Sequence, residues 1–225
     1  MKENMDKFLD QPLQHQLKKI FTELMHPVKV VFFSTNKNCA YCEQIEGLLS
    51  EVAELSDKLT FVSKDIAEDE ELARLYGVNE APVFVLLGDD NGKELDYQIR
   101  FYGMPGGHEF TSLINDLMLV SRRDSGLQPE TRKFLKGLTS PVHLQVFVTP
   151  TCPYCPQAVV LAHQMAIESD KITADMVEAL EFPEWANEFN VSGVPQTTIN
   201  MGAGTVIGGV PEDSLVEQIK EALAV

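Results

Sequence analysis

Cys152-Pro153-Tyr154-Cys155 is the stretch of sequence around which the whole chain is organised. It follows the apolar run 142–148 and precedes an apolar, helix-like segment at 156–167. Two thiols at a strand-to-helix junction form the arrangement that thiol redox chemistry uses. With two residues between them at the start of a helix, the sulfurs are about one turn apart, within reach of a disulfide bond.

The two cysteines of this motif are expected to have different roles. At the start of the helix, the sulfur of Cys152 lies over unpaired backbone N–H groups at the positive end of the helix dipole, which favours its thiolate form. The sequence therefore predicts Cys152 as the nucleophile and Cys155 as the resolving thiol. Pro153 is tolerated in the first turn because the N–H that it lacks has no helical partner there.

The same motif occurs a second time. Cys39-Ala40-Tyr41-Cys42 begins 113 residues before Cys152 and follows its own apolar, strand-like run at 28–33. The chain has four cysteines, and the two motifs use all of them. Cys39 and Cys42 are therefore the second candidate pair of nucleophile and resolving thiol.

Two prolines repeat together with the cysteines. Pro82 follows Cys39 by 43 residues, and Pro195 follows Cys152 by the same interval. Two matched intervals indicate an internal duplication. A proline at the head of a strand, preceded by a small apolar residue, is a candidate cis peptide, and here both are expected to face the thiols.

These features resemble the thioredoxin and glutaredoxin superfamily, in which Cys-x-x-Cys after the first strand is followed further on by Val-Pro or Ala-Pro. Cys-Pro-Tyr-Cys is the glutaredoxin form of the motif. Two such units in one chain resemble the glutaredoxin-like protein disulfide oxidoreductases of archaea and bacteria. The resemblance implies that Pro82 and Pro195 pair their backbone with the substrate and keep metal ions away from the thiols.

A second resemblance lies in the stretch 107–113, Gly-His-Glu-Phe-Thr-Ser-Leu. It is similar to the N-terminal redox domain of the flavoprotein that reduces the bacterial alkyl hydroperoxide peroxiredoxin. That domain keeps a functional thiol pair only in its second unit, whereas this chain has both pairs.

Hydrophobic periodicity predicts the same order of elements in both units. In the first unit we expect helices at 6–24, after Cys39, at 68–76 and from Gly107 to about 120, with strands at 28–34, 59–64, 82–88 and 97–102 and a hairpin turn at 90–92. In the second unit we expect helices at 129–138, 156–167, 182–189 and 211–223, with strands at 142–148, 172–178, 196–200 and 205–207.

This order is the one that the thioredoxin fold requires. We therefore expect an α/β protein of two tandem thioredoxin-like domains, each a central mixed sheet flanked by helices. The aperiodic stretch 121–128 is the expected linker, which divides the chain into an N-terminal domain at 1–125 and a C-terminal domain at 126–225.

The composition limits the partners. The chain of 225 residues has a formal net charge of −16 and no basic run to bind a phosphate backbone, so nucleic-acid binding is not expected. No apolar run approaches the roughly 20 residues that span a bilayer, and the stretch 1–15 is polar without an apolar signal core. We expect a cytoplasmic protein without a membrane partner, and in that compartment cysteine pairs are usually catalytic or metal-binding.

Three other uses of the cysteines compete with redox exchange. Zinc-binding Cys-x-x-Cys pairs usually recur within about 15 to 20 residues, far less than the interval seen here. An iron–sulfur cluster shared between two chains, as in some glutaredoxins, normally goes with a weakened second cysteine, and both second cysteines are present. A structural disulfide across three residues restrains little of the unfolded chain. Redox exchange is favoured, and no bound metal is expected.

Four residues are candidate substrate contacts: Pro82, Pro195, Tyr41 and Tyr154. The tyrosines occupy equivalent places before the resolving cysteines. Two roles fit them, control of access to the sulfur or simple packing, and the sequence favours neither.

Together these residues predict a thiol–disulfide oxidoreductase that reduces, forms or isomerises protein disulfides. The chain has no Gly-x-Gly-x-x-Gly fingerprint, so we expect no bound cofactor and electrons from a separate thioredoxin-reductase-like flavoprotein or from glutathione. The expected partners are disulfide-containing proteins and that reductase. An alternative is an electron relay to a peroxiredoxin, and an alternative of another class is a redox-sensitive binding protein or chaperone without turnover.

Overall fold

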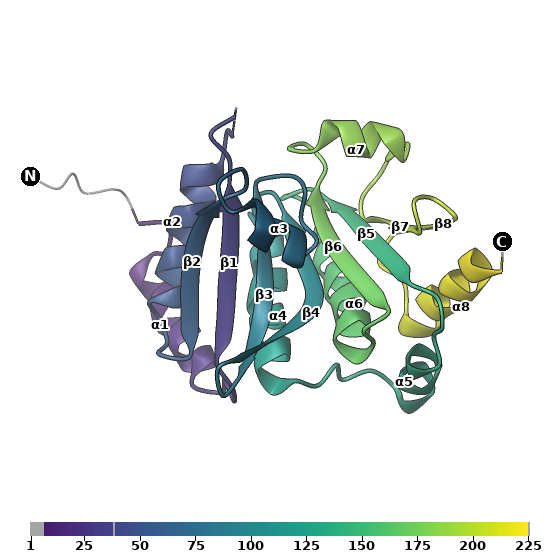
Figure 1. Ribbon diagram of the computed structural model, residues 1–225, viewed down its shortest axis with the longest axis horizontal. Helices are drawn as coiled ribbons and strands as arrows, with labels where there is room; N and C mark the ends of the chain where they lie inside the picture. Colours follow the sequence, from purple (N-terminus) through teal and green to yellow (C-terminus); the bar gives the residue numbers. More distant parts are fainter. Residues whose placement is uncertain (1–6, 38, 225) are drawn as a thin grey trace, which may run out of the picture.

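The computed structural model describes residues 7–37 and 39–224. The first half of the chain contains α1 (Gln11–Phe21), β1 (Val28–Ser34), α2 (Cys42–Ala53), β2 (Leu59–Asp65), α3 (Glu70–Leu75), β3 (Val83–Asp90), β4 (Lys93–Tyr102) and α4 (Glu109–Arg122) (Figure 1). The second half repeats this order with α5 (Pro129–Lys136), β5 (Val142–Val148), α6 (Cys155–Glu168), β6 (Ile172–Glu178), α7 (Pro183–Glu188), β7 (Gln196–Ile199), β8 (Gly204–Ile207) and α8 (Glu212–Leu223).

The first helix is shorter than its periodicity predicts. It begins at Gln11 because Oδ1 of Asp10 accepts a hydrogen bond from the Leu13 N–H at 2.8 Å, and a proline occupies the first turn. Leu9 and Leu24 are buried outside the helix, which explains why they extend the apolar pattern. The predicted start at residue 6 lies outside the described residues, as does the beginning of the polar stretch 1–15.

The eight strands of the described residues form one mixed sheet in the order β2-β1-β3-β4-β6-β5-β7-β8. Each half contributes four neighbouring strands, and β4 of the first half pairs in parallel with β6 of the second, from Ile99 opposite Ala174 to Tyr102 opposite Val177. The sequence indicated a mixed sheet for each unit but carried no sign that the two sheets join edge to edge. Because β4 and β6 pair directly, the two halves form one continuous body (Figure 1).

The direction of the strands follows from the pairing. β1 runs antiparallel to β3, β3 antiparallel to β4, β4 parallel to β6, and β6 parallel to β5. β1 and β5, which precede the two cysteine motifs, therefore run parallel to each other. Their C-terminal ends lie on the same side of the sheet.

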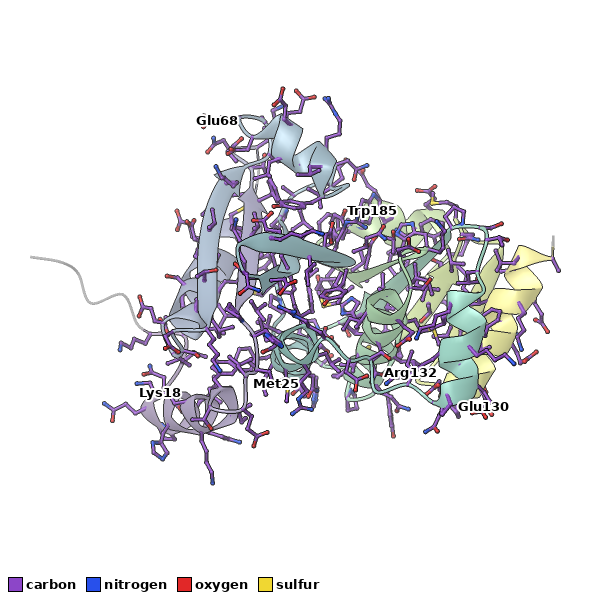
Figure 2. The ribbon with its side chains drawn as sticks, turned by 60° about the horizontal axis from the view of Figure 1, so that its bottom comes forward. Lys18, Met25, Glu68, Glu130, Arg132 and Trp185 are labelled. Atoms are coloured by element: carbon purple, nitrogen blue, oxygen red, sulfur yellow. A yellow bond between two sulfur atoms is a disulfide. The ribbon has the colours of Figure 1, made fainter. Side chains whose placement is uncertain are left out.

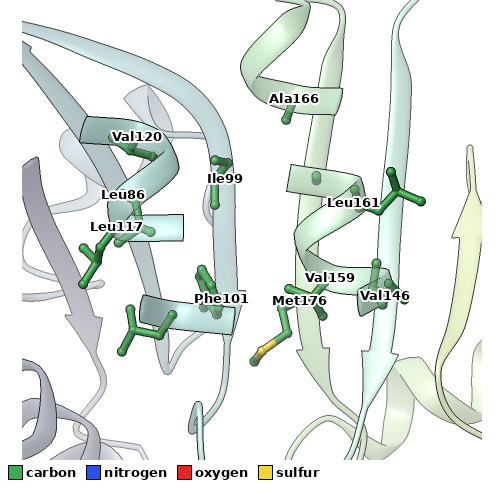
Figure 3. Packing of buried hydrophobic residues seen from close by; sticks show 14 of the residues in the cluster. Leu86, Ile99, Phe101, Leu117, Val120, Val146, Val159, Leu161, Ala166 and Met176 are labelled. Atoms are coloured by element: carbon green, nitrogen blue, oxygen red, sulfur yellow. The ribbon is translucent and has the colours of Figure 1, made fainter. Parts of the chain in front are cut away.

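Helices cover the sheet unequally on its two faces. One large apolar cluster packs α1, α2, α4, α5, α6 and α8 against one face of the sheet, and it runs without a break from Leu17 to Ile219 across both halves. Figure 3 shows Phe101 and Leu117 of the first half beside Met176 and Val159 of the second. A smaller cluster on the opposite face packs α3 and α7.

The halves also contact each other through helices on both faces. Nδ1 of His163 on α6 lies 2.6 Å from Oδ2 of Asp116 on α4, and both side chains are fully buried. On the opposite face Trp185 of α7, which is labelled in Figure 2, packs edge-on against Tyr102 of β4. The ring centroids are 4.9 Å apart. These contacts and the β4–β6 pair hold the halves in a fixed arrangement.

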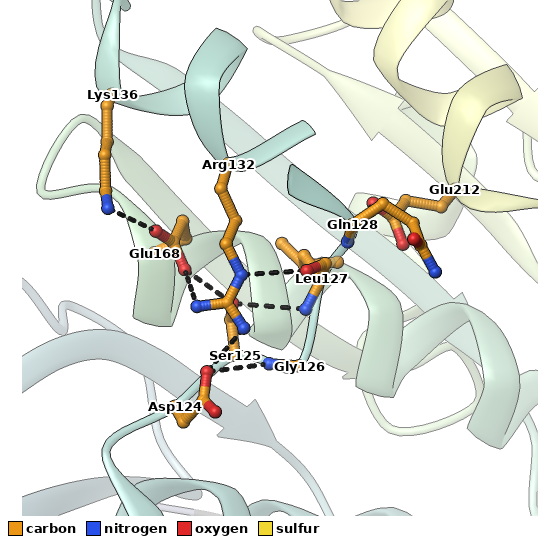
Figure 4. A network of polar contacts seen from close by, with 9 residues as sticks. All are labelled: Asp124, Ser125, Gly126, Leu127, Gln128, Arg132, Lys136, Glu168 and Glu212. Atoms are coloured by element: carbon orange, nitrogen blue, oxygen red, sulfur yellow. Dashed lines mark hydrogen bonds and ion pairs between the residues drawn. The ribbon is translucent and has the colours of Figure 1, made fainter. Parts of the chain in front are cut away.

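The linker changes its polar partners between Arg123, which binds the first half, and Asp124 and Ser125, which bind the second half. Arg123 binds Asp89 and Asp90 of the first half, whereas Asp124 pairs with Arg132 on α5 (Figure 4). Ser125 donates a hydrogen bond to Glu168 on α6. Within the described residues, no helix is both long and apolar enough to span a membrane.

Candidate active sites

The first site lies at the end of β1. The chain leaves the sheet after Ser34, and α2 begins at Cys42, so the cysteines flank the first turn of that helix. Cys39 and Cys42 form a disulfide with their Cα atoms 5.5 Å apart. Both residues are partly exposed, which leaves this site open to a partner protein.

The second site repeats this geometry at the end of β5. Cys152 and Cys155 form a disulfide with the same Cα separation of 5.5 Å, and α6 begins at Cys155. Cys152 is 7% exposed and Cys155 is fully buried, so a partner can reach only the first sulfur directly. Direct attack on a partner disulfide requires an accessible sulfur, whereas the resolving sulfur needs to reach only its neighbour.

Both predicted cis peptides are present. The Ala81–Pro82 and Val194–Pro195 bonds are cis, directly before β3 and β7. The carbonyl oxygen of Pro82 accepts a hydrogen bond from the Gly103 N–H at 3.0 Å, and that of Pro195 accepts one from the Gly208 N–H at 2.8 Å. The prolines are thus held identically in the two units, and Pro82 lines the same cavity as Cys39.

That cavity lies where the two halves meet and has a volume of about 380 Å³. Its first-half wall consists of Cys39, Ala40, Tyr41, Ala81, Pro82 and Met104. Its second-half wall consists of Pro150, Glu178, Leu180 and Glu181. The first-half wall thus combines a disulfide, a cis proline and apolar side chains in one cavity, where an extended peptide can present its own disulfide to Cys39.

Comparison with known proteins agrees with this geometry. Residues 12–102 match the thioredoxin family, and residues 142–221 match the thioredoxin domain in a second form. Each match covers one cysteine motif and its cis proline. The chain contains two thioredoxin-family domains.

Proteins similar to this chain occur in bacteria and archaea. The alkyl hydroperoxide reductase protein AhpF of Staphylococcus epidermidis is 29% identical over 187 residues, covering 83% of this chain and 33% of the relative. The corresponding Escherichia coli protein is 28% identical over 194 residues, covering 85% of this chain and 34% of the relative. This chain therefore spans about a third of the length of these relatives.

Two solved structures share the whole arrangement. The protein disulfide oxidoreductase of Aeropyrum pernix superposes with a TM-score of 0.85 at 29% identity, over 94% of this chain and 92% of that chain. The N-terminal NTD_N/C domain of Enterococcus faecalis AhpF superposes with a TM-score of 0.84 at 26% identity, over 94% and 100% of the two chains. Both resemblances seen in the sequence are confirmed.

The tyrosines of the two thioredoxin-family motifs are both exposed. Tyr41 is 46% exposed and lines the cavity beside Cys39, and Tyr154 is 68% exposed. Neither side chain is buried in the apolar core.

A buried carboxyl lies close to the second site. Gly107 has a φ of +57°, and a Cβ there would overlap the carbonyl oxygen of Pro150, so only glycine lets this loop approach the second motif. The His108 N–H donates to the same oxygen at 3.0 Å. Glu109 follows with 1% of its surface exposed, and burial raises its pKa to about 7.

Sequence reasoning missed the residues that the second domain adds to the first site. Glu178 is the last residue of β6, and Leu180 and Glu181 follow it. They reach the Cys39 cavity only because β6 pairs with β4. The duplication aligns Glu178 and Glu181 with Asp65, the last residue of β2, and with Glu68 in the turn that follows. No spacing in the sequence signals this contact, since it depends on how the two sheets join.

Proposed function

We propose that this protein exchanges electrons with protein disulfides through two thioredoxin-like sites, with Cys39 and Cys152 as nucleophiles and Cys42 and Cys155 as resolving thiols. The observation that carries the proposal is the repeated constellation of a disulfide at a strand-to-helix junction and a cis proline before the neighbouring strand. The greater exposure of Cys152 than of Cys155 supports the division of roles.

The exchange proceeds in two balanced steps. The thiolate of Cys39 or Cys152 attacks one sulfur of a substrate disulfide, forms a mixed disulfide and releases the other substrate sulfur as a thiolate that takes up a proton. Cys42 or Cys155 then attacks the mixed disulfide, which releases the second substrate thiol and leaves the enzyme with an internal disulfide. Two electrons pass to the substrate, and the reverse sequence inserts a disulfide.

Substrate binding is assigned to the cis prolines and the tyrosines. Pro82 and Tyr41 line the cavity beside Cys39, which supports backbone pairing and shielding of the mixed disulfide at the first site. Pro195 and Tyr154 occupy the equivalent positions at the second site, and the high exposure of Tyr154 suits a contact with a partner protein.

Electrons for the reductive direction come from a separate flavoprotein of the thioredoxin-reductase type or from glutathione. The similarity to the alkyl hydroperoxide reductase protein AhpF favours a second candidate function, a relay that delivers electrons to a peroxiredoxin. Both candidates place the protein in the cytoplasm, where thiol pairs are kept available for turnover.

The first experiment is insulin reduction driven by dithiothreitol, with the wild type, Cys39→Ser, Cys152→Ser and the double variant side by side. We expect each single variant to keep part of the activity and the double variant to fall to the background rate, because each domain has a complete site. Activity in Cys39→Ser together with none in Cys152→Ser would instead assign the chemistry to the second site alone.

Wild-type protein without any insulin reduction would reject the general oxidoreductase. The relay is then tested by peroxide consumption with a peroxiredoxin and a flavoprotein reductase. A variant with all four cysteines replaced separates the chaperone alternative, since suppression of aggregation by that variant would need no thiol chemistry.

A further inference from the structure

The cavity beside Cys39 contains two carboxyl groups supplied by the other domain. Glu178 is 3% exposed and Glu181 is partly buried, and both lie in the cavity wall formed by the second domain. Leu180, between them in the chain, is 74% exposed. The wall opposite the disulfide therefore combines an accessible apolar surface with negative charge.

The contacts of these carboxyl groups are only partly satisfied. Oε2 of Glu178 accepts a hydrogen bond from the Glu181 N–H at 2.7 Å, and Oε1 is buried without a partner. Oε1 of Glu181 accepts from the Met104 N–H at 2.7 Å. Within residues 7–37 and 39–224 no lysine, arginine or histidine forms an ion pair with either glutamate.

Burial raises the pKa of both glutamates, and the charge of Glu178 raises that of Glu181 further. Two carboxyl groups close together in a partly desolvated wall stabilise a cation that enters beside them. The residues that the structure describes supply none there, so a cation brought by the substrate would provide the counter-charge.

The duplication provides an internal comparison. Asp65 and Glu68 of the first domain form the equivalent turn, and Oδ1 of Asp65 accepts from the Ala67 and Glu68 N–H groups as Glu178 does from Glu181. Glu68 is exposed, and it follows β2, which is an edge strand of the sheet. The turn is therefore common to both domains, and its placement against a redox cavity is particular to the second.

We propose that the Cys39–Cys42 site prefers disulfides whose cysteine is flanked by a lysine or arginine, with the aliphatic stem packed on Leu180 and Tyr41 and the cationic group at Glu181 and Glu178. Such side chains bury an apolar stem while their charged end meets a carboxylate. This inference rests on the proposed function, and it gives the first site a substrate class of its own.

The test uses full-length protein with Cys152 and Cys155 replaced by serine, pre-reduced and mixed with an excess of peptide disulfide. The peptides are homodimers of one short sequence that differ only in the residue before the cysteine, which is Arg, Gln or Glu. Release of peptide thiol in a single turnover gives the rate at which the first site attacks the peptide disulfide. No reductase is present whose own substrate preference could alter this rate.

We expect the Arg peptide to be reduced about tenfold faster than the Gln peptide, as one charge-assisted contact allows, and the Glu peptide to be the slowest. Glu181→Gln keeps the acceptor for Met104 and removes the charge, so the Arg-to-Gln ratio should fall to about twofold or less. Glu181→Lys should invert the order of the Arg and Glu peptides. Salt at high concentration should reduce the wild-type ratio.

Glu68→Gln is the matched control, because it removes the same charge from the equivalent turn while Glu68 does not line the Cys39 cavity, and it should leave all three rates unchanged. Equal rates for the Arg and Gln peptides, or a ratio that survives Glu181→Gln and Glu181→Lys, would overturn the inference while the oxidoreductase remains. If neither the Gln peptide nor the Arg peptide is reduced, the first site has no activity, and the inference falls with it.

Discussion

Glu109 is a carboxyl whose burial costs stability at neutral pH. It is 1% exposed, its Oε2 accepts a hydrogen bond from Ser112 at 2.6 Å, and its Oε1 is buried without a partner. Desolvation is the main cause of its pKa of about 7, and the charge of Asp116 adds to it. The carboxyl is neutral in the folded protein at mildly acidic pH and must ionise within the fold above that.

The direction of the pH effect follows from this shift. The folded-state pKa is raised above the ordinary value of 4.5, so the stability that this group contributes is complete below about pH 4.5 and is lost as pH rises through about 7. Glu109→Gln stays neutral, and we expect its free energy of unfolding relative to the wild type to increase by about 3 kcal/mol between pH 4 and pH 8. Urea denaturation of both proteins across this range measures the difference.

Glu54→Gln serves as the control, because that residue is exposed at the end of α2, and the free energy of unfolding of this variant relative to the wild type should change little between pH 4 and pH 8. A difference between Glu109→Gln and the wild type that stays constant from pH 4 to pH 8 would show that Glu109 does not titrate within the fold in this window.

At the scale of elements, the pair of strands β4 and β6 carries a buried ion pair across the boundary between the domains. Arg100 and Asp175 are paired in the strand register, and their side chains approach to 3.5 Å. Nε of Arg100 donates to the Tyr76 carbonyl, and Asp175 also binds Nε2 of His143. Two strands from different domains are thereby joined by side chains as well as by backbone hydrogen bonds.

Removal of one partner leaves the other charge buried. Asp175→Asn should lower the free energy of unfolding by about 3–5 kcal/mol, because Arg100 is 7% exposed and would lose its counter-charge. Glu70→Gln, which breaks the exposed pair with Arg74, should change it by less than about 1 kcal/mol. Chemical denaturation of the wild type and of the two variants measures these free energies of unfolding. Equal effects of Asp175→Asn and Glu70→Gln would contradict the prediction.

The sequence predicted the elements far better than the way in which they join. The strands at 28–34, 142–148 and 172–178 lie where predicted, because buried parallel strands are continuous apolar runs. β4 begins at Lys93 and not at 97, since its first residues are polar and partly exposed and lack an apolar signal. The cysteines and prolines were found because their spacing repeats, whereas Glu178 and Glu181 reach the first site through an edge pairing that has no periodic signature.

At the scale of the whole molecule, the domains depend on each other. We propose a domain boundary between residues 125 and 126. Nearby, the linker binds Asp89 and Asp90 of the first domain and then Arg132 and Glu168 of the second. Separate fragments 1–125 and 126–225 would expose the β4 and β6 edges together with the buried faces of α4 and α6. We expect each fragment to aggregate or unfold readily, and the intact chain to unfold in one cooperative transition.

Calorimetry of the intact chain and size-exclusion chromatography of the fragments, alone and co-expressed, measure this dependence. Co-expression should recover a soluble complex with the fold of the intact chain. Two monomeric, folded fragments and two separate transitions in the intact chain would show that the domains are independent.

Because β1 and β5 point the same way within one continuous sheet, both disulfides open at the same edge of the molecule at a separation that does not vary. A partner protein captured at one of them therefore experiences the other at a constant effective concentration, as in a bivalent reagent with a stiff spacer. Partners with two reducible disulfides spaced to match would gain avidity, and those with a different spacing would not.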